Sequence, residues 1–182
     1  MTRRGIAIAV VLCALLAVAA SAQAKDANVI APATACPNQA NRSAPADVQL
    51  QAMLCMTNYA RHASGLKPLT RSRPLAQAAG HKSADILRCG EFSHEACGHE
   101  FTYWIERFGY TQGCWSAGEN IGYGTGGLGS VRNIFSAWMN SSGHQANILG
   151  RFREIGIGRE VGELEGAAGA VVWTQDFGSH VC

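Results

Sequence analysis

The sequence has almost no net charge and no run of charged residues of one sign. Its 182 residues include 15 Lys and Arg against 13 Asp and Glu, which gives a formal charge of +2. Proteins that bind nucleic acid or anionic lipid through electrostatics concentrate basic residues in a patch or a run. The charge pattern therefore gives no reason to expect such a partner, and we predict that nucleic acid is not one.

The sequence also lacks the motifs of several enzyme classes. No G-x-S-x-G elbow surrounds Ser141 and Ser142, which argues against a serine hydrolase. His94 and His99 are five residues apart, which on a helix is a rotation of about 500° against about 400° for H-E-x-x-H, so they would not share a face. Residues 122–127 match G-x-G-x-x-G, but no acidic residue follows about twenty positions later, and a close-packed turn explains the glycines better than a nucleotide.

The N-terminus has the pattern of a secretory signal. Arg3 and Arg4 precede an apolar stretch at residues 6–20, and Ala22-Gln23-Ala24 fits the A-x-A cleavage site. A membrane anchor is the alternative, but the apolar stretch is short for a spanning helix and small residues close it. We predict cleavage after Ala24 and a secreted protein with no transmembrane anchor.

Cleavage would remove Cys13 and leave an even number of cysteines: Cys36, Cys55, Cys89, Cys97, Cys114 and Cys182. In an oxidising compartment this predicts three disulfides, and it argues against both a catalytic thiol and a zinc finger built from Cys89, His94, Cys97 and His99. Six cysteines allow 15 connectivities. Proximity in the sequence favours these pairs: Cys36–Cys55, Cys97–Cys114 and Cys89–Cys182.

The length predicts one globular domain, which we place at residues 46–182 after a linker or extended arm at 25–45. Apolar periodicity and stop residues predict helices at 47–65, 73–90, 99–108 and 131–139. Alternation predicts strands at 116–123, 154–159 and 170–177, with an extended connector at 66–69 and a turn at Gly143-His144. Antiparallel strands that follow several helices favour an α+β fold over an alternating β-α-β sheet.

Three polar residues on separate elements form the candidate cavity cluster: His94, Glu119 and His144. Neutral imidazole and carboxylate groups suit a divalent metal such as zinc, with an open position for water. The same groups could instead bond to one another as a structural cluster, and the sequence leaves both alternatives open. Six residues are expected to support the site: Asn58, Arg61, Asn120, Ser141, Asn147 and Gln175.

Seven motifs occur in an order that resembles a known family between Asp47 and Phe177. They are Asn58-x-x-Arg61 with Gly65-Leu66-x-Pro68-Leu69, Phe92-Ser93-His94, Gly109-Tyr110, Gly118-Glu119-Asn120-Ile121, Trp138-Met139-x-Ser141-x-Gly143-His144-x-x-Asn147-Ile148-Leu149, Ile155-Gly156-Ile157-Gly158 and Trp173-Thr174-Gln175-x-Phe177. Together they resemble the bacterial branch of the CAP or SCP-like family, which contains cysteine-rich secretory proteins, antigen 5 and pathogenesis-related proteins.

The resemblance implies an extracellular protein with a three-layer α-β-α sandwich around a central antiparallel sheet. It also implies a cavity with two histidines and acidic groups, in which His94, Glu119 and His144 match three of four positions. The fourth, a glutamate in eukaryotic members, falls near Ser141, where this sequence departs from the pattern.

Three functional hypotheses follow. The first is a secreted module that binds a small apolar or lipid-like ligand, or an extracellular protein or cell-surface partner, without turnover. The second is a metal-assisted hydrolase in which His94 and His144 hold a zinc-like ion and Glu119 is the general base. The third is a non-catalytic structural or interaction domain, in which the polar cluster only stabilises the fold.

Overall fold

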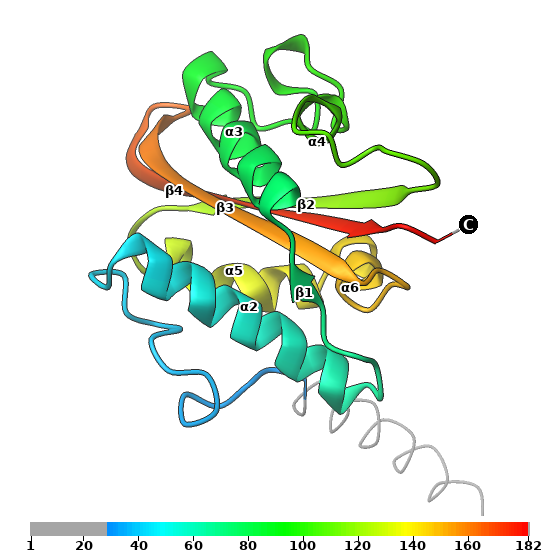
Figure 1. Ribbon diagram of the computed structural model, residues 1–182. Coiled ribbons are helices and arrows are strands. Elements are labelled where there is room, and N and C mark those ends of the chain that lie inside the picture. Colours follow the sequence, from blue (N-terminus) through cyan, green and yellow to red (C-terminus); the bar gives the residue numbers. More distant parts are fainter. Residues whose placement is uncertain (1–28, 182) are drawn as a thin grey trace, which may run out of the picture.

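The computed structural model describes residues 29–181 and shows a sheet with helices on both faces (Figure 1). The predicted signal sequence and Cys182 lie outside the described residues. Helices α2 (Ala46–Ala63) and α5 (Val131–Met139) cover one face of the sheet, and α3 (Arg73–Cys89) covers the other. The predicted α+β class and sandwich arrangement are confirmed.

The sheet contains four strands in the order β1-β3-β4-β2. Strand β4 (Ala167–Ser179) pairs antiparallel with both β2 (Ser116–Gly124) and β3 (Glu154–Leu164). The two-residue strand β1 (Thr70–Arg71) pairs parallel with β3, so the sheet is mixed and the prediction of an antiparallel sheet was wrong at this edge. The connector after α2 leads into β1, and a parallel pair needs a long crossover, which begins here with α3.

Two helices differ from the prediction. Helix α4 (Tyr103–Arg107) is shorter than the predicted 99–108, because His99 bonds to Asp85 and its own backbone is extended. The predicted turn at Gly143-His144 lies in helix α6 (Ser142–Ile148). Gly143 and Asn147 are weak helix formers, so burial of Ile148 in the core is what favours this helix. Two short 3₁₀ helices, η1 (Ala96–Gly98) and η2 (Gly126–Gly129), complete the described elements.

Helix α3 lies unusually close to β3 because two glycines of that strand face it. A Cβ atom at Gly156 would lie 1.9 Å from the carbonyl carbon of Leu75, and one at Gly158 would lie 2.1 Å from the carbonyl oxygen of Ala79. Only a residue without a side chain permits this approach. The sequence Ile155-Gly156-Ile157-Gly158 therefore directs apolar side chains towards α2 and leaves space for the α3 backbone.

The arm before α2 is attached to the domain. The predicted Cys36–Cys55 disulfide is present, and Cys36 is fully buried. The side chain of Gln39 donates to the carbonyl oxygens of Ala31 and Cys36, and it accepts from Arg132 of α5. Residues 29–45 therefore lie against α2 and α5.

The other two predicted disulfide pairs were wrong. Cys89 pairs with Cys97, at a Cα–Cα distance of 5.5 Å, and not with Cys182, and Cys97 does not pair with Cys114. Gly90 ends α3 in the left-handed conformation, with φ of 63°, and turns the chain back on the helix. This local reversal brings together two cysteines that are eight residues apart. Distance along the sequence alone did not distinguish this pairing from the other possible pairings. Cys114 is disulfide-bonded as well.

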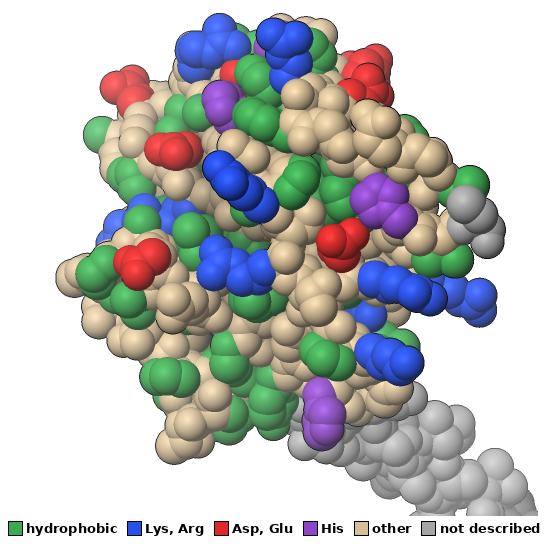
Figure 2. All heavy atoms as spheres, in the orientation of Figure 1, with side chains coloured by type: hydrophobic (Ala, Val, Ile, Leu, Met, Phe, Trp, Pro, Cys, Tyr) green, Lys and Arg blue, Asp and Glu red, His purple; other side chains and the backbone are tan. Residues whose placement is uncertain are grey.

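None of the helices in residues 29–181 combines the length and apolar character needed to cross a bilayer. In the view of Figure 2, Lys, Arg, Asp and Glu side chains are scattered over the face that carries β1, between small groups of hydrophobic side chains. This face therefore presents no broad apolar surface.

Candidate functional site

His94 and Glu119 form a hydrogen-bonded pair beside β2. His94 lies in the loop after α3, and its Nδ1 is 2.7 Å from Oε1 of Glu119 in β2. The Glu119 side chain is only 2% exposed, whereas the His94 side chain is 51% exposed. With Nδ1 bonded to a buried carboxylate, Nε2 is the nitrogen that His94 offers to a ligand.

The third predicted residue, His144, comes from α6. Its Nδ1 is 2.8 Å from Oγ of Ser141, and its ring lies near that of Trp138. Burial lowers the pKa of His144, and the neighbouring His94 lowers it further. His144 is therefore a neutral imidazole at neutral pH, and Ser141, where the resemblance implied an acid, is its hydrogen-bond partner.

A chain of amide side chains connects α6 to the sheet. Nδ2 of Asn147 donates to the carbonyl oxygen of Glu119 and to Oδ1 of Asn120, at 3.0 and 2.9 Å. Nδ2 of Asn120 donates to the carbonyl oxygen of His144 and to Oε1 of Gln175, at 3.2 and 3.3 Å. These amides fix the position of His144 and of the β2 backbone.

Asn58 and Arg61 of α2 bond to other parts of the chain. Asn58 exchanges two hydrogen bonds with the backbone of Leu69. The buried Arg61 donates to four carbonyl oxygens, those of Lys67, Ile148, Gly150 and Phe152. Asn58 therefore holds the connector, Arg61 holds both the connector and the end of α6, and neither lines the pocket described below.

Two buried charged residues beneath Glu119 were not identified from the sequence. Asp176 of β4 lies directly opposite Glu119 in the strand register, and Lys82 of α3 lies nearby; each is 1% exposed. Burial raises the pKa of Asp176 well above its ordinary value, and the negative charge of Glu119 raises it further, while Lys82 opposes both. In the sequence each lies among other polar residues, Lys82 between His81 and Ser83 and Asp176 after Thr174 and Gln175, so neither stood out.

The two carboxyl groups need a proton between them. Among the described residues, Oε2 of Glu119 and Oδ1 of Asp176 are buried without a hydrogen-bond partner. Two ionised carboxylates cannot bond to each other, whereas a protonated Asp176 donates to Glu119. The raised pKa of Asp176 and the unpaired oxygens therefore indicate a protonated Asp176 that can donate to Glu119.

The raised pKa of Asp176 makes a prediction about stability. Because the folded state holds this proton more tightly than the unfolded chain, the unfolding free energy falls as pH rises from the ordinary pKa of 3.8 towards the folded value. Each pH unit in that interval costs about 1.4 kcal/mol. Asp176→Asn, whose amide can donate to Glu119, should therefore be more stable than the parent at pH 7 and less sensitive to pH above 4. Urea unfolding at several pH values measures this, and Glu95→Gln, which removes an exposed carboxylate, should change neither property.

Two hollows lie along β2. The larger has a volume of about 260 Å³ and is lined by Phe92, Ile121, Gly122, Tyr123, Ile134, Ala137, Trp138, Ser141 and His144. We call it the β2 pocket. Trp138 forms a fixed wall, because its Nε1 donates to the carbonyl oxygen of Ile121 at 2.8 Å. The second hollow, of about 230 Å³, is lined by His94, Phe101, Gly118 and Glu119.

The described residues do not bring His94, Glu119 and His144 together as three metal ligands. No group of three or more His, Cys, Asp and Glu side chains within residues 29–181 lies close enough to hold a metal ion. Glu119 bonds to His94 through one oxygen and buries the other, and His144 bonds to Ser141. One oxygen of Glu119 and Nδ1 of each histidine are thus used within the protein, and Nε2 of His94 and Nε2 of His144 are the nitrogens left for a ligand.

Comparisons with known proteins agree with this fold. A relative, the uncharacterized protein YkwD of Bacillus subtilis, is 35% identical over 152 residues, which are 81% of this chain and 54% of YkwD. This chain thus spans about half the length of that relative. An extracellular SCP-domain protein from Bacillus anthracis superposes with a TM-score of 0.58 at 24% identity, over 74% of this chain and 43% of the other.

Two further solved structures show the same fold at lower identity. An outer surface protein of Borrelia burgdorferi gives a TM-score of 0.63 at 16% identity, over 76% of this chain and 97% of the other. A cysteine-rich secretory protein of Staphylococcus aureus gives a TM-score of 0.55 at 22% identity, over 72% of this chain and 38% of the other. The profile of the cysteine-rich secretory protein family matches residues 54–177, so this chain belongs to the CAP family.

Proposed function

We propose that the chain is an exported binding module whose β2 pocket takes a small apolar or lipid-like ligand. The observation that carries the proposal is the character of the pocket wall. Apolar side chains, chiefly Ile121, Ile134 and Trp138, make up most of it, and two polar side chains, Ser141 and His144, are on the same wall. Small-molecule sites typically combine a largely apolar wall with a few placed polar groups.

The polar groups define how an amphipathic ligand would lie. Its apolar part would contact Trp138 and Ile134, and its polar end would lie near His144. Nδ1 of His144 is already bonded to Ser141, so Nε2 remains for the ligand. The lowered pKa of His144 favours contact with a neutral polar group, such as a hydroxyl or a protonated carboxyl, over a fixed anion.

Export is part of the proposal. Its support is the pattern of charged, apolar and small residues in the first 24 positions, together with the disulfides in the folded domain. The description of the similar Bacillus anthracis protein as extracellular points the same way. An exported module with a preformed apolar pocket can bind a poorly soluble molecule outside the cytoplasm.

The test fills the pocket without touching the core. Ala137 is exposed on α5 and lines the pocket, so Ala137→Phe should occupy part of its volume. Binding of 1-aminoanthracene, a fluorescent apolar probe displaced by dodecanoic acid, should be saturable in the parent and at least about tenfold weaker in the variant, a loss of about 1.4 kcal/mol. The measurement is a fluorescence titration.

Ala146→Phe is the matched control, because Ala146 is exposed on α6 and does not line the pocket. It should bind the probe with the affinity of the parent. If the parent shows no saturable binding, or if both phenylalanine variants bind as the parent does, the proposed function is wrong.

A further inference from the structure

The loop from Gly90 to His99 supplies part of the wall of both hollows. Phe92 lines the β2 pocket, and His94 lines the second hollow and bonds to Glu119. Ala96 is the one residue of this loop that is fully buried. Hydrophobic burial therefore contributes little to the position of Phe92 and His94. Covalent and hydrogen bonds to α3 must hold the loop in place instead.

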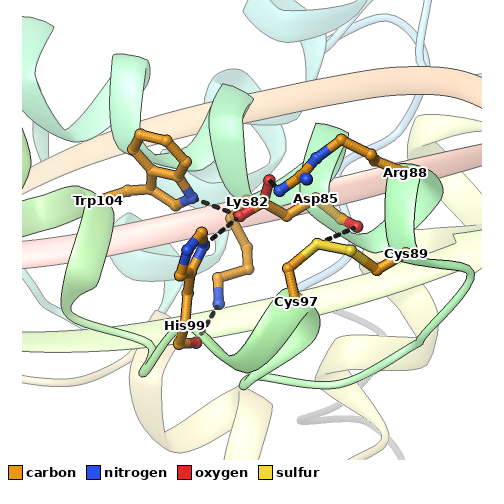
Figure 3. The surroundings of a disulfide bond; sticks show 7 residues. All are labelled: Lys82, Asp85, Arg88, Cys89, Cys97, His99 and Trp104. Carbon is orange, nitrogen blue, oxygen red and sulfur yellow. Dashed lines mark hydrogen bonds and ion pairs between the residues drawn. A yellow bond between two sulfur atoms is a disulfide. The ribbon is translucent and has the colours of Figure 1, made fainter.

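Three attachments connect the loop to α3 (Figure 3). The Cys89–Cys97 disulfide closes a ring that contains both Phe92 and His94. Nζ of Lys82 donates to the carbonyl oxygen of His94 at 2.5 Å and to that of His99 at 3.4 Å, the bond drawn in Figure 3. Oδ2 of Asp85 accepts from Nδ1 of His99 at 2.8 Å and from Nε1 of Trp104, a residue beyond the loop, at 2.7 Å.

The covalent attachment is the one that can be opened from outside. Cys89 is exposed and Cys97 is half-buried, whereas in the Cys36–Cys55 disulfide Cys36 is fully buried and Cys55 is half-buried. Thiol–disulfide exchange requires that a thiolate reach a sulfur atom, so access decides which disulfide reacts first. Of these two disulfides, an external dithiol should reduce Cys89–Cys97 first.

Opening this bond should free the loop without unfolding the domain. Cys97 has a φ of 62°, a left-handed conformation that is uncommon for a residue other than glycine. Once the ring is open, the disulfide no longer holds Cys97 in it. The main core cluster, which includes Met53, Phe135 and Trp173, contains no residue of the loop.

We propose that Cys89–Cys97 is a redox site that holds the β2 pocket in its binding form, and that reduction by a dithiol releases Phe92 and His94 and weakens ligand binding. The ligand part rests on the proposed function. A thiolate of the dithiol attacks one cysteine sulfur and forms a mixed disulfide, and its second thiolate then releases the protein thiol. The dithiol is oxidised to a disulfide, and its two electrons and two protons convert Cys89 and Cys97 into thiols.

The experiment titrates 1-aminoanthracene into protein equilibrated at graded ratios of reduced to oxidised dithiothreitol. Free thiols are then alkylated and located by mass spectrometry. The dissociation constant should rise at least tenfold in step with alkylation of Cys89 and Cys97. A loss of affinity that follows alkylation of Cys114 instead, or full affinity with Cys89 and Cys97 alkylated, would overturn the proposal.

A double variant and a second readout separate this inference from the proposed function. Cys89→Ser with Cys97→Ser should bind the probe as weakly as the reduced parent at every dithiothreitol ratio; binding as tight as the oxidised parent would overturn the inference. Hydrogen exchange needs no ligand: amides 91–99 should exchange faster after reduction while those of α2 do not. If the oxidised parent binds no probe, the proposed function fails, and exchange alone decides whether the disulfide controls the loop.

Discussion

Gly156→Ala should abolish stable folding or lower the unfolding free energy by about 4 kcal/mol or more. The added Cβ would lie 1.9 Å from the carbonyl carbon of Leu75 and 2.1 Å from the backbone nitrogen of Ala76. Both contacts are with the α3 backbone, so no side-chain rotation can relieve them, and α3 would have to move away from β3. Denaturant unfolding followed by circular dichroism measures the loss, and the yield of soluble protein reports the more severe outcome.

Gly80→Ala is the matched control, since it makes the same chemical change within α3. A Cβ at Gly80 meets no atom within 4 Å. Alanine has a higher helix propensity than glycine, so this variant should be stabilised by about 0.5 to 1 kcal/mol. Equal stabilities for the two variants would show that the close approach of α3 to β3 is not what the glycine provides.

Lys82→Met should lower the unfolding free energy by about 3 to 5 kcal/mol, the range measured when one partner of a buried ion pair is removed. Methionine keeps the length and apolar stem of lysine but loses the ammonium group, which donates to the loop carbonyls of His94 and His99. Because Lys82 also opposes the rise in the pKa of Asp176, its loss should raise that pKa further. Thermal and urea unfolding at pH 7 measure the effect.

Lys67→Met makes the same substitution at an exposed lysine whose side chain has no role in the site. It should change stability by no more than about 0.5 kcal/mol. Comparable losses in both variants would mean that net charge, and not the buried position of Lys82, determines the effect.

The sequence predicted elements best where local signals and tertiary contacts agree. Helix α5 begins and ends as predicted, because Ser130 caps it and its apolar residues face the core. Strands β3 and β4 extend beyond the predicted ends, since residues such as Glu160 and Glu163 break the apolar alternation and yet are paired across the hairpin. Helix α6 has weak local signals and depends on tertiary packing, so no local pattern revealed it.

The candidate site was predicted only in part, for a similar reason. His94, Glu119 and His144 stood out because polar residues beside glycine turns are conspicuous, and the first two are in contact. Lys82 and Asp176 have polar neighbours in the sequence, which hide them. Their meeting with Glu119 depends on the pairing of β2 with β4 and on the packing of α3, which are long-range features that no local spacing encodes.

The position of β2 at the end of the sheet has a consequence for solubility. A terminal strand with unpaired backbone groups can pair with another molecule and start aggregation. Here the indole of Trp138 donates a hydrogen bond to the carbonyl oxygen of Ile121, and the side-chain amide of Asn147 donates one to that of Glu119. Trp138, which lines the pocket, thus also helps to protect the strand from intermolecular pairing, and a substitution that widens the pocket at Trp138 should make the protein prone to aggregate.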